Sequence, residues 1–250
     1  MAPNVASPIT WQLATVTAVR DETPTVRSLS LALPGWTGHR AGQHVDVRLT
    51  AEDGYSVERS YSIASEPEVA GAIEITVERI EDGEVSPYLD DVVVPGDRFE
   101  VRGPIGGYFV WQAALGGPLF LVAGGSGVVP LMAMLRHRTR TGTDIPTRLL
   151  FSSRHVEEII YREELDRLTA AGDGLQVAYT LTRSQPAGWS GYRRRIDDRM
   201  LAEVLEPLGV SALVYICGPT ALVETAANAL VRLGLPPARV RTERFGPTGT

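Results

Sequence analysis

A glycine-rich loop follows the most apolar stretch of the chain. The segment Gly124 to Gly127 joins the apolar run 119–123 to a helix expected over 130–140. Glycines let a backbone approach a ligand closely, and the free amides at a helix N-terminus attract a phosphate. A tight turn between strand and helix is the plainer interpretation, and the spacing is not G-x-G-x-x-G. The position after the first strand of a βαβ pattern favours a nucleotide site.

A second candidate loop, residues 83–89, interrupts a strand-rich region. Pro87 suits the first turn of a short helix, and Ser86 suits its N-cap. Backbone amides at such a turn can hold a second phosphate. Taken alone, the pattern favours an ordinary capped turn.

A short strand pattern, Arg59-Ser60-Tyr61-Ser62, lies upstream of that turn. In a strand, Arg59 and Tyr61 share one face, and Ser60 and Ser62 share the other. An arginine beside a tyrosine can grip a phosphate and cover an aromatic ring. A strand without a ligand would often show the same pattern.

The composition excludes several chemistries. All 24 basic residues are arginine, so a lysine Schiff base and a phosphate-binding lysine are excluded. The net charge of −6 argues against general nucleic-acid binding. The single cysteine, Cys217, permits no internal disulfide, no cysteine zinc site and no iron–sulfur cluster on this chain. We therefore expect no metal site.

The N-terminal residues 1–8 have neither a charged lead nor an apolar run, so no signal peptide is expected. The apolar stretch 119–135 is broken by glycines and Pro130, which is untypical of a membrane span. We expect a cytoplasmic monomer that binds neither nucleic acid nor membrane.

Two patterns of hydrophobicity divide the chain. Short alternating runs between Trp11 and Trp111 predict a six-stranded antiparallel β-barrel in residues 1–112. After Gly116-Gly117-Pro118, apolar strands alternate with helical segments, which predicts a doubly wound parallel α/β domain in residues 113–250. The helices are expected over 130–140, 157–170, 199–205 and 220–233.

These segments resemble the ferredoxin–NADP reductase superfamily, whose motifs occur in the same order across nearly the whole chain. The matching residues are Arg59, Tyr61 and Ser62 for R-x-Y-[ST]; Gly83, Ser86 and Leu89 for G-x-x-S-x-x-L; residues 124–130 for the glycine-rich loop; Cys217, Gly218 and Pro219 for C-G-P; and Glu243 and Phe245 for a plant-type Glu-x-Tyr ending with Phe in place of Tyr. Unlike that ending, five residues follow Phe245.

The resemblance implies that the barrel binds FAD. Arg59 would hold the pyrophosphate, Tyr61 would pack on the flavin–ribityl region, and Ser62 would lie near the flavin N5/O4 edge. The other implied FAD residues are Ser60, Val77, Gly83, Val85, Ser86 and Phe245. FMN stays open on the residues alone.

The resemblance also implies that the α/β domain binds NAD(P)H. Cys217 would pack against the nicotinamide, although from the residues alone it suits a small buried side chain at a strand end. Catalytic roles would fall on Ser62, Cys217 and Glu243. The implied nucleotide residues are Gly124, Gly125, Ser126, Gly127, Ser153, Arg154, Arg162, Cys217, Gly218 and Pro219.

The residues after the second apolar strand favour NADPH over NADH. An acidic residue there would bind both ribose hydroxyls, whereas Arg154 attracts a 2′-phosphate and Arg162 could assist. A surface arginine neutralised by Glu157 or Glu158 is the alternative. Two further basic clusters, 136–140 and 193–195, are expected to be solvated surface.

The resemblance implies a reductase component without a fused ferredoxin domain. It would pass a hydride from NADPH, or NADH, to FAD and then electrons to a separate acceptor such as ferredoxin or an oxygenase. The alternatives are a free-flavin or ferric reductase, and a non-catalytic nucleotide-binding regulatory module.

Overall fold

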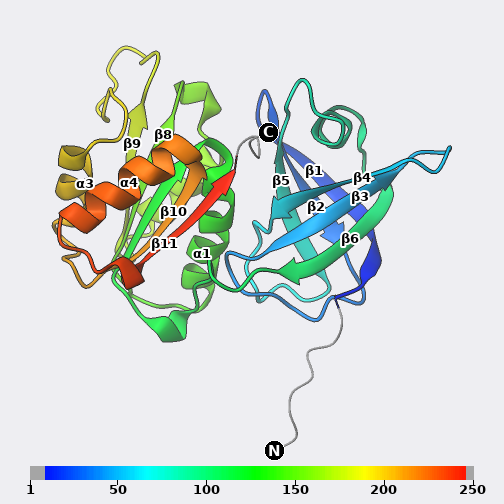
Figure 1. Cartoon of the computed structure of the whole chain (residues 1–250), viewed down its shortest axis with the longest axis horizontal. Coiled ribbons are helices and arrows are strands. Elements are labelled where there is room, and N and C mark those ends of the chain that lie inside the picture. Colours follow the sequence, from blue (N-terminus) through cyan, green and yellow to red (C-terminus); the bar gives the residue numbers. More distant parts are fainter. Residues whose placement is uncertain (1–8, 246–250) are drawn as a thin grey trace, which may run out of the picture.

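The computed structural model describes residues 9–245 and consists of two packed domains (Figure 1). The first is a six-stranded antiparallel sheet with the order β4-β3-β6-β1-β2-β5. A bridge between Ile63 and Ile75 brings its two edges together, which closes the sheet into the predicted barrel. The strands are β1 (Trp11–Thr23), β2 (Val26–Ala32), β3 (His44–Thr50), β4 (Ser56–Ser62), β5 (Ala72–Glu78) and β6 (Arg98–Ile105).

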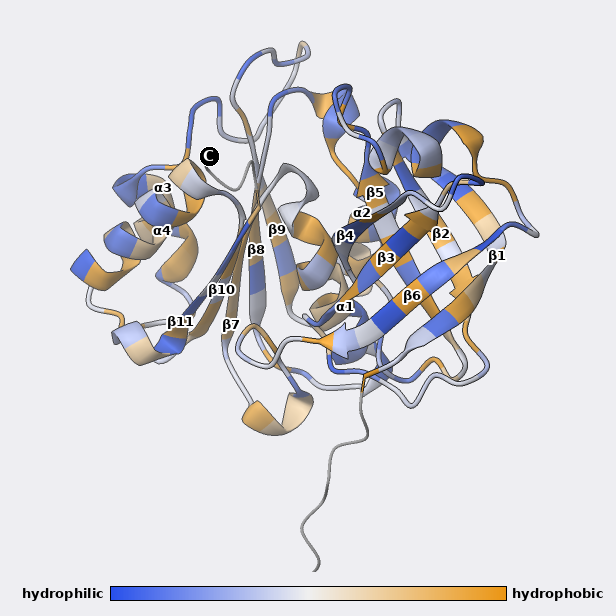
Figure 2. Cartoon of the chain, turned by 45° about the vertical axis from the view of Figure 1, so that its right-hand side comes forward, coloured by the Kyte–Doolittle hydropathy of each residue, from blue (hydrophilic) through white to orange (hydrophobic). Residues whose placement is uncertain are grey.

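The alternation that predicted these strands fills the barrel core. Figure 2 shows apolar and polar bands along β3, β6 and β1. On β3, Val45 and Val47 are fully buried, while the residues between and beside them are only partly buried. Because successive side chains of a strand point to opposite faces, one apolar face suffices for the core.

The expected short helix in the first domain is present. Residues 86–92 are helical and end as a π-helical turn, Tyr88–Val92. Val85 and Leu89 are buried in the barrel core, so this helix covers part of the barrel.

The second domain is a five-stranded parallel sheet with the order β11-β10-β7-β8-β9. Every residue of β7 is buried, as expected for a strand that is covered on both faces. The strands are β7 (Leu119–Gly124), β8 (Thr147–Ser153), β9 (Leu175–Leu181), β10 (Leu213–Pro219) and β11 (Val240–Phe245).

Helices cover both faces of this sheet. Residues of α1 (Val128–Arg140) and α2 (Arg162–Ala170) share one apolar cluster with buried barrel residues, and α3 (Asp198–Leu205) and α4 (Thr220–Arg232) form another. Figure 1 shows α1 between the parallel sheet and the barrel. The domain is therefore doubly wound, as predicted.

The predicted start of one helix was wrong, although the helix itself is present. The helix expected from residue 157 begins at Arg162, after a 3₁₀ turn, Val156–Glu158. Tyr161 has φ 59° and ψ 23°, which a continuous right-handed helix excludes. Ile159, Ile160 and Tyr161 are buried, so packing rather than helical periodicity determines this segment.

The connection between the domains is buried at residues 109–111, whereas Gln112, Ala114, Leu115 and Gly117 further along it are exposed. Phe109 and Trp111 belong to the same apolar cluster as α1, and the Tyr215 hydroxyl donates to the Val110 carbonyl at 2.8 Å. The predicted boundary at residue 112 lies between β6 and β7 and stays a prediction. Within residues 9–245, no helix has the length and apolar character needed to span a bilayer.

Candidate functional site

The glycine-rich loop lies at the topological switch point of the parallel sheet. From β7 the chain proceeds to β8 and β9 on one side and returns to β10 on the other. Ligands of open α/β sheets bind at the carboxyl ends of the strands at such a point. Here the loop after β7 meets the end of β10, which carries Cys217, Gly218 and Pro219.

Close backbone contact explains the glycines on both sides of this junction. A Cβ at Gly127 would overlap the Cys217 carbonyl and lie 2.8 Å from the Gly218 amide nitrogen. A Cβ at Gly218 would lie 3.1 Å from the Gly124 amide nitrogen. The structure thus brings together the two nucleotide motifs that the sequence separates by some ninety residues.

Cys217 and Glu243 are paired across β10 and β11. Cys217 is fully buried, and burial raises the pKa of its thiol well above the usual value. Because the thiolate is the nucleophile, this side chain is suited to packing and not to covalent chemistry.

Glu243 is the more unusual member of the pair. Burial raises the pKa of its carboxyl to about 7, and its Oε2 atom is buried with no hydrogen-bond partner in residues 9–245. Buried polar atoms are normally paired. This oxygen can therefore accept a hydrogen bond from a ligand, or exchange a proton near neutral pH.

Phe245 ends the described part of β11. It pairs with Pro219 and packs, partly buried, against the apolar cluster that contains α1. Figure 1 shows the end of β11 between the two domains.

The Arg-x-Tyr strand is β4. Arg59 and Tyr61 pair across with Val47 and Val45 of β3, and so lie on one face. Arg59 is exposed, and its guanidinium makes one hydrogen bond within the described residues, to the Glu58 carbonyl at 2.8 Å. Its charge is thus available to an anion. The Tyr61 ring packs against the barrel core, and burial raises the pKa of its hydroxyl.

The serines of β4 differ from each other. The Ser60 hydroxyl donates to Asp46 Oδ1 at 2.7 Å, which commits it to a contact within the barrel. Ser62 is half-buried and makes no side-chain hydrogen bond in the described residues. Two residues beyond Tyr61, Ile63 bridges to Ile75, two residues before Val77. Val77 is fully buried in the barrel core.

The turn at residues 83–86 is hydrogen-bonded to the segment just after β5. The Ile80 amide donates to the Ser86 hydroxyl at 3.1 Å. The helix has no side-chain cap hydrogen bond, so the prediction that Ser86 caps it was wrong. Its own hydroxyl hydrogen remains available to a ligand. A Cβ at Gly83 would lie 3.0 Å from Ser86 Oγ, and Val85 is buried beneath the turn.

Ser153 and Arg154 follow β8, at the same edge of the sheet as the glycine-rich loop. Ser153 is buried and donates to the His155 carbonyl at 3.1 Å. Arg154 is 60% exposed and pairs with Glu158 at 3.1 Å. Such an exposed pair contributes about 0.3–0.5 kcal/mol, so a phosphate can displace the carboxylate. Arg162 is exposed at the start of α2.

One candidate residue was missed from the sequence. The Arg183 amide, just after β9, donates to the Arg154 carbonyl at 3.0 Å. Two exposed arginines therefore end neighbouring parallel strands. An Arg two residues after the apolar strand 175–181 was the available signal.

The cluster at 136–140 was expected to be solvated surface, which is wrong for its first three residues, although Thr139 and Arg140 are exposed. Arg138 is 1% exposed and pairs with Asp173 at 2.8 Å, and Arg136 pairs with Glu74 and Glu164. Both belong to the packing of α1. The cluster 193–195 is exposed, as predicted.

The donors at these two places fit the expected cofactors. An unpaired arginine and a free hydroxyl suit a pyrophosphate, and a half-buried tyrosine suits an aromatic ring. Across the domain border, the unpartnered Glu243 oxygen suits a carboxamide or ribose donor.

Comparisons with known proteins identify both domains. Residues 13–110 match the oxidoreductase FAD-binding domain, and residues 121–228 match the oxidoreductase NAD-binding domain. A ferredoxin–NADP reductase B of Sorangium cellulosum is 35% identical over 93% of this chain and 96% of its own length. A glycine betaine monooxygenase reductase subunit of Pseudomonas aeruginosa is 31% identical over 99% of this chain and 70% of its own.

The crystal structure of a cytochrome P450 reductase of Amycolatopsis has the same fold. It superposes with a TM-score of 0.85 at 26% identity, covering 100% of this chain and 74% of that one. The two family models and this superposition therefore cover both domains in the same order. It belongs to the ferredoxin–NADP reductase superfamily of FAD-dependent NAD(P)H oxidoreductases.

Proposed function

We propose that this oxidoreductase takes a hydride from NADPH and delivers electrons to a separate redox protein, a ferredoxin or the terminal component of an oxygenase. The Ser126 hydroxyl donates to Glu78 of the barrel at 2.6 Å, and this observation carries the proposal. It joins the nucleotide loop to the end of β5, the strand that meets the flavin motif.

Arg59, Ser86 and the amides beside Ser86 would hold the FAD pyrophosphate, and Tyr61 and Ser62 would contact the flavin. FAD, when bound, supplies the step from two-electron to one-electron chemistry. Cys217 would fill the space beneath the nicotinamide. Glu243 would accept a hydrogen bond there through its unpartnered oxygen, which fixes the orientation of the ring.

A preference for NADPH is supported by the edge formed by β8 and β9. Arg154 and Arg183 end these strands, and no acidic side chain stands at either position. Guanidinium groups bind phosphate through two parallel hydrogen bonds. Arg162 would be the third cation of this group.

The nature of the acceptor is supported by the relatives. Their names describe a monooxygenase reductase subunit, a ferredoxin–NADP reductase and a cytochrome P450 reductase. With one cysteine, this chain cannot ligate an iron–sulfur cluster, so the one-electron centre belongs to the partner.

We extend the proposal to a cytoplasmic monomer, because a net charge of −6 and a single cysteine suit a protein of a reducing compartment. Sedimentation of the purified chain tests the oligomeric state, and fractionation of its host tests the location.

The decisive experiment is anaerobic titration of the purified protein. We expect a yellow protein whose flavin absorption is bleached by NADPH and restored by a ferredoxin or an oxygenase component. Free flavin and ferric iron are the comparison acceptors. Faster turnover with either of them would indicate a free-flavin or ferric reductase instead. A colourless protein that FAD does not reconstitute would instead indicate a regulatory nucleotide-binding module.

A further inference from the structure

The outer face of β5 carries three polar residues at alternate positions. The inward residues of this strand are apolar and belong to the barrel core. Glu74, Thr76 and Glu78 therefore lie on the opposite face. Each of them contacts a different part of the α/β domain, and we call the three contacts the β5 seam.

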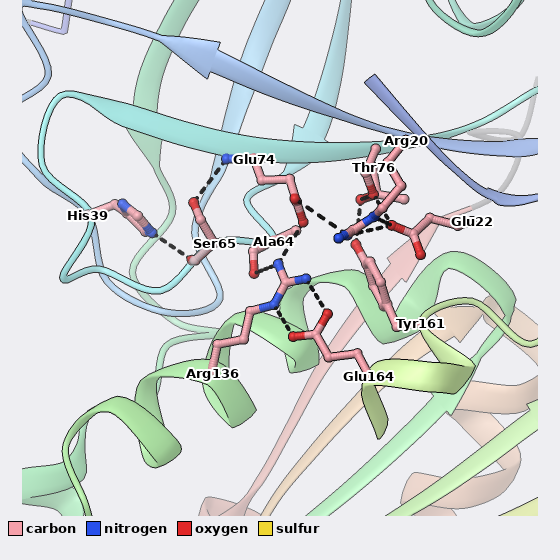
Figure 3. Close-up of polar contacts among 11 residues, drawn as sticks. Arg20, Glu22, His39, Ala64, Ser65, Glu74, Thr76, Arg136, Tyr161 and Glu164 are labelled. Atoms are coloured by element: carbon pink, nitrogen blue, oxygen red, sulfur yellow. Dashed lines mark hydrogen bonds and ion pairs between the residues drawn. The ribbon is translucent and has the colours of Figure 1, made fainter. Parts of the chain in front are cut away.

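The first contact is an ion-pair network around Arg136 of α1. Its Nη1 atom donates to Glu74 Oε1 at 2.6 Å and to the Ala64 carbonyl at 3.0 Å. Its Nε and Nη2 atoms bind the Glu164 carboxylate at 2.8 and 2.7 Å. Figure 3 shows this guanidinium between a barrel carboxylate and an α2 carboxylate.

The second contact joins Thr76 to Tyr161 through their hydroxyl groups. Thr76 is also bonded to Ser28 of β2 at 2.7 Å. Tyr161 is 2% exposed, and within residues 9–245 it is the one non-glycine residue with positive φ. A hydrogen bond from the barrel thus holds Tyr161, the strained residue just before α2.

The third contact reaches the glycine-rich loop. The Ser126 hydroxyl donates to Glu78 Oε2 at 2.6 Å, a distance typical of a charge-assisted bond. Ser126 is the one residue between Gly124 and Gly127 with a side chain, and Gly125 has a φ of +54°. The hydrogen-bonding side chain of this loop is therefore engaged by the barrel.

We propose that Glu78 is a positioning residue that holds the glycine-rich loop, through Ser126, at a fixed place relative to the barrel. A carboxylate repels an anionic pyrophosphate, so Glu78 is not a ligand of the dinucleotide's phosphates. Its effect on the loop is mechanical. The backbone of the loop is already packed against β10, and the Glu78 contact adds a restraint from the barrel.

This inference rests on the proposed function, because the benefit arises when the two cofactors must meet. The barrel would hold the hydride acceptor, and the loop would hold the phosphates of the donor. Hydride transfer depends steeply on distance and angle, and an error of about 1 Å can cost a hundredfold in rate. A contact that spans the domain border reduces this error.

A double-mutant cycle of Glu78→Ala and Ser126→Ala tests the proposal on the full chain with FAD bound. Hydrogen exchange of the loop amides, followed in a peptide covering residues 122–131 without nucleotide, is the first measurement. Each single variant should exchange about tenfold faster than the wild type, as expected for losing one charge-assisted hydrogen bond. The double variant should be no faster than either single variant.

The second measurement is the limiting rate of anaerobic flavin reduction at saturating NADPH. It should fall about tenfold in Glu78→Ala and recover most of its value in Glu78→Gln, which keeps an acceptor oxygen. FAD content should stay that of the wild type, and the unfolding midpoint should fall by no more than about 2–4 °C, as expected for one lost hydrogen bond. The matched control is Glu100→Ala, a strand glutamate of β6 paired with Arg48.

Unchanged loop exchange in Glu78→Ala would overturn the proposal. So would an undiminished effect of Glu78→Ala in the Ser126→Ala background, because Glu78 would then act through another residue. Failure of the proposed function gives a different result. NADPH would then not reduce the flavin of the wild type, while hydrogen exchange in the four proteins of the double-mutant cycle would still be as expected.

Discussion

At the scale of single residues, Glu243 combines burial with an unsatisfied oxygen. The rise of its pKa from 4.5 to about 7 corresponds to about 3 kcal/mol against the charged form. No cation compensates this cost within the described residues, since burial is the cause of the shift. A carboxylate kept at such a cost indicates a functional role more than a structural one.

The Glu243→Gln variant should change how stability depends on pH. In the wild type the folded state binds more protons than the unfolded state between pH 4.5 and about 7. Its stability therefore falls as pH rises through this window, by up to about 3 kcal/mol. Glutamine removes this loss, so the variant should gain relative to the wild type from pH 4.5 to 7. Urea unfolding at pH 4.5 and pH 7 measures the free energy of unfolding of both proteins. The same difference between them at both pH values would contradict the raised pKa of Glu243.

Arg154 and Arg183 should together determine the choice of nicotinamide nucleotide. Replacing either by alanine should raise the KM for NADPH about tenfold, the effect of one charge-assisted contact, and change the KM for NADH less than about twofold. Arg199→Ala, on α3, is the matched control because this exposed arginine pairs with Glu203 at 2.8 Å. Equal changes for both nucleotides would remove the 2′-phosphate assignment.

At the scale of elements, the junction of β7 and β10 is determined by backbone contact. The turn after β7 passes so close to the end of β10 that neither strand can move without the other. Interiors are packed too densely to absorb an added atom at such a place. The nucleotide loop and the Cys217 segment therefore form one unit.

Gly127→Ala should disrupt that unit. The added methyl group would overlap the Cys217 carbonyl, and a backbone atom cannot rotate away as a side chain can. We expect a destabilisation of about 1–3 kcal/mol and a weaker affinity for NADP⁺, followed through the flavin spectrum. Gly107→Ala is the control, because a Cβ there meets only the end of the Arg40 side chain at 3.5 Å. Wild-type affinity in Gly127→Ala would mean that the loop moves freely.

At the scale of the whole molecule, the two domains share a core. The apolar cluster around α1 contains barrel residues such as Ala64 and Val26. The β5 seam adds three polar contacts across the same border, of which the Thr76–Tyr161 contact is buried and the other two are partly buried. Interfaces between domains are commonly more polar and more mobile than this. We therefore expect the described chain to unfold in one cooperative transition.

Arg136→Ala should separate the two domains in unfolding experiments. The side chain of Arg136 is 12% exposed, and its loss leaves the Glu74 and Glu164 carboxylates partly buried without their shared cation. Breaking such a pair costs about 3–5 kcal/mol. Calorimetry should show a lower midpoint and two transitions, whereas Arg199→Ala should keep one. A single unshifted transition would mean that the apolar cluster alone joins the domains.

The sequence was sufficient for the elements and their order. Alternation with a period of two predicted the barrel strands, and the fully apolar run 119–123 predicted the buried β7, because these patterns record burial locally. The exception was the start of α2, where residues 159–161 follow the packing against the barrel. Helical periodicity carries no information about such a long-range contact.

The sequence by itself determined the two cofactor motifs and the two folds, because each depends on residue types at short spacing, and its single cysteine excluded an iron–sulfur cluster on this chain. Only the tertiary structure decided which charges meet. Arg136 and Arg138 looked like helix-end surface residues but lie buried on distant carboxylates, and Arg183 stands beside Arg154 only because β8 and β9 are neighbours. Pairing across a sheet or a domain border joins residues far apart in the chain. A local sequence pattern therefore does not show which of these residues come into contact.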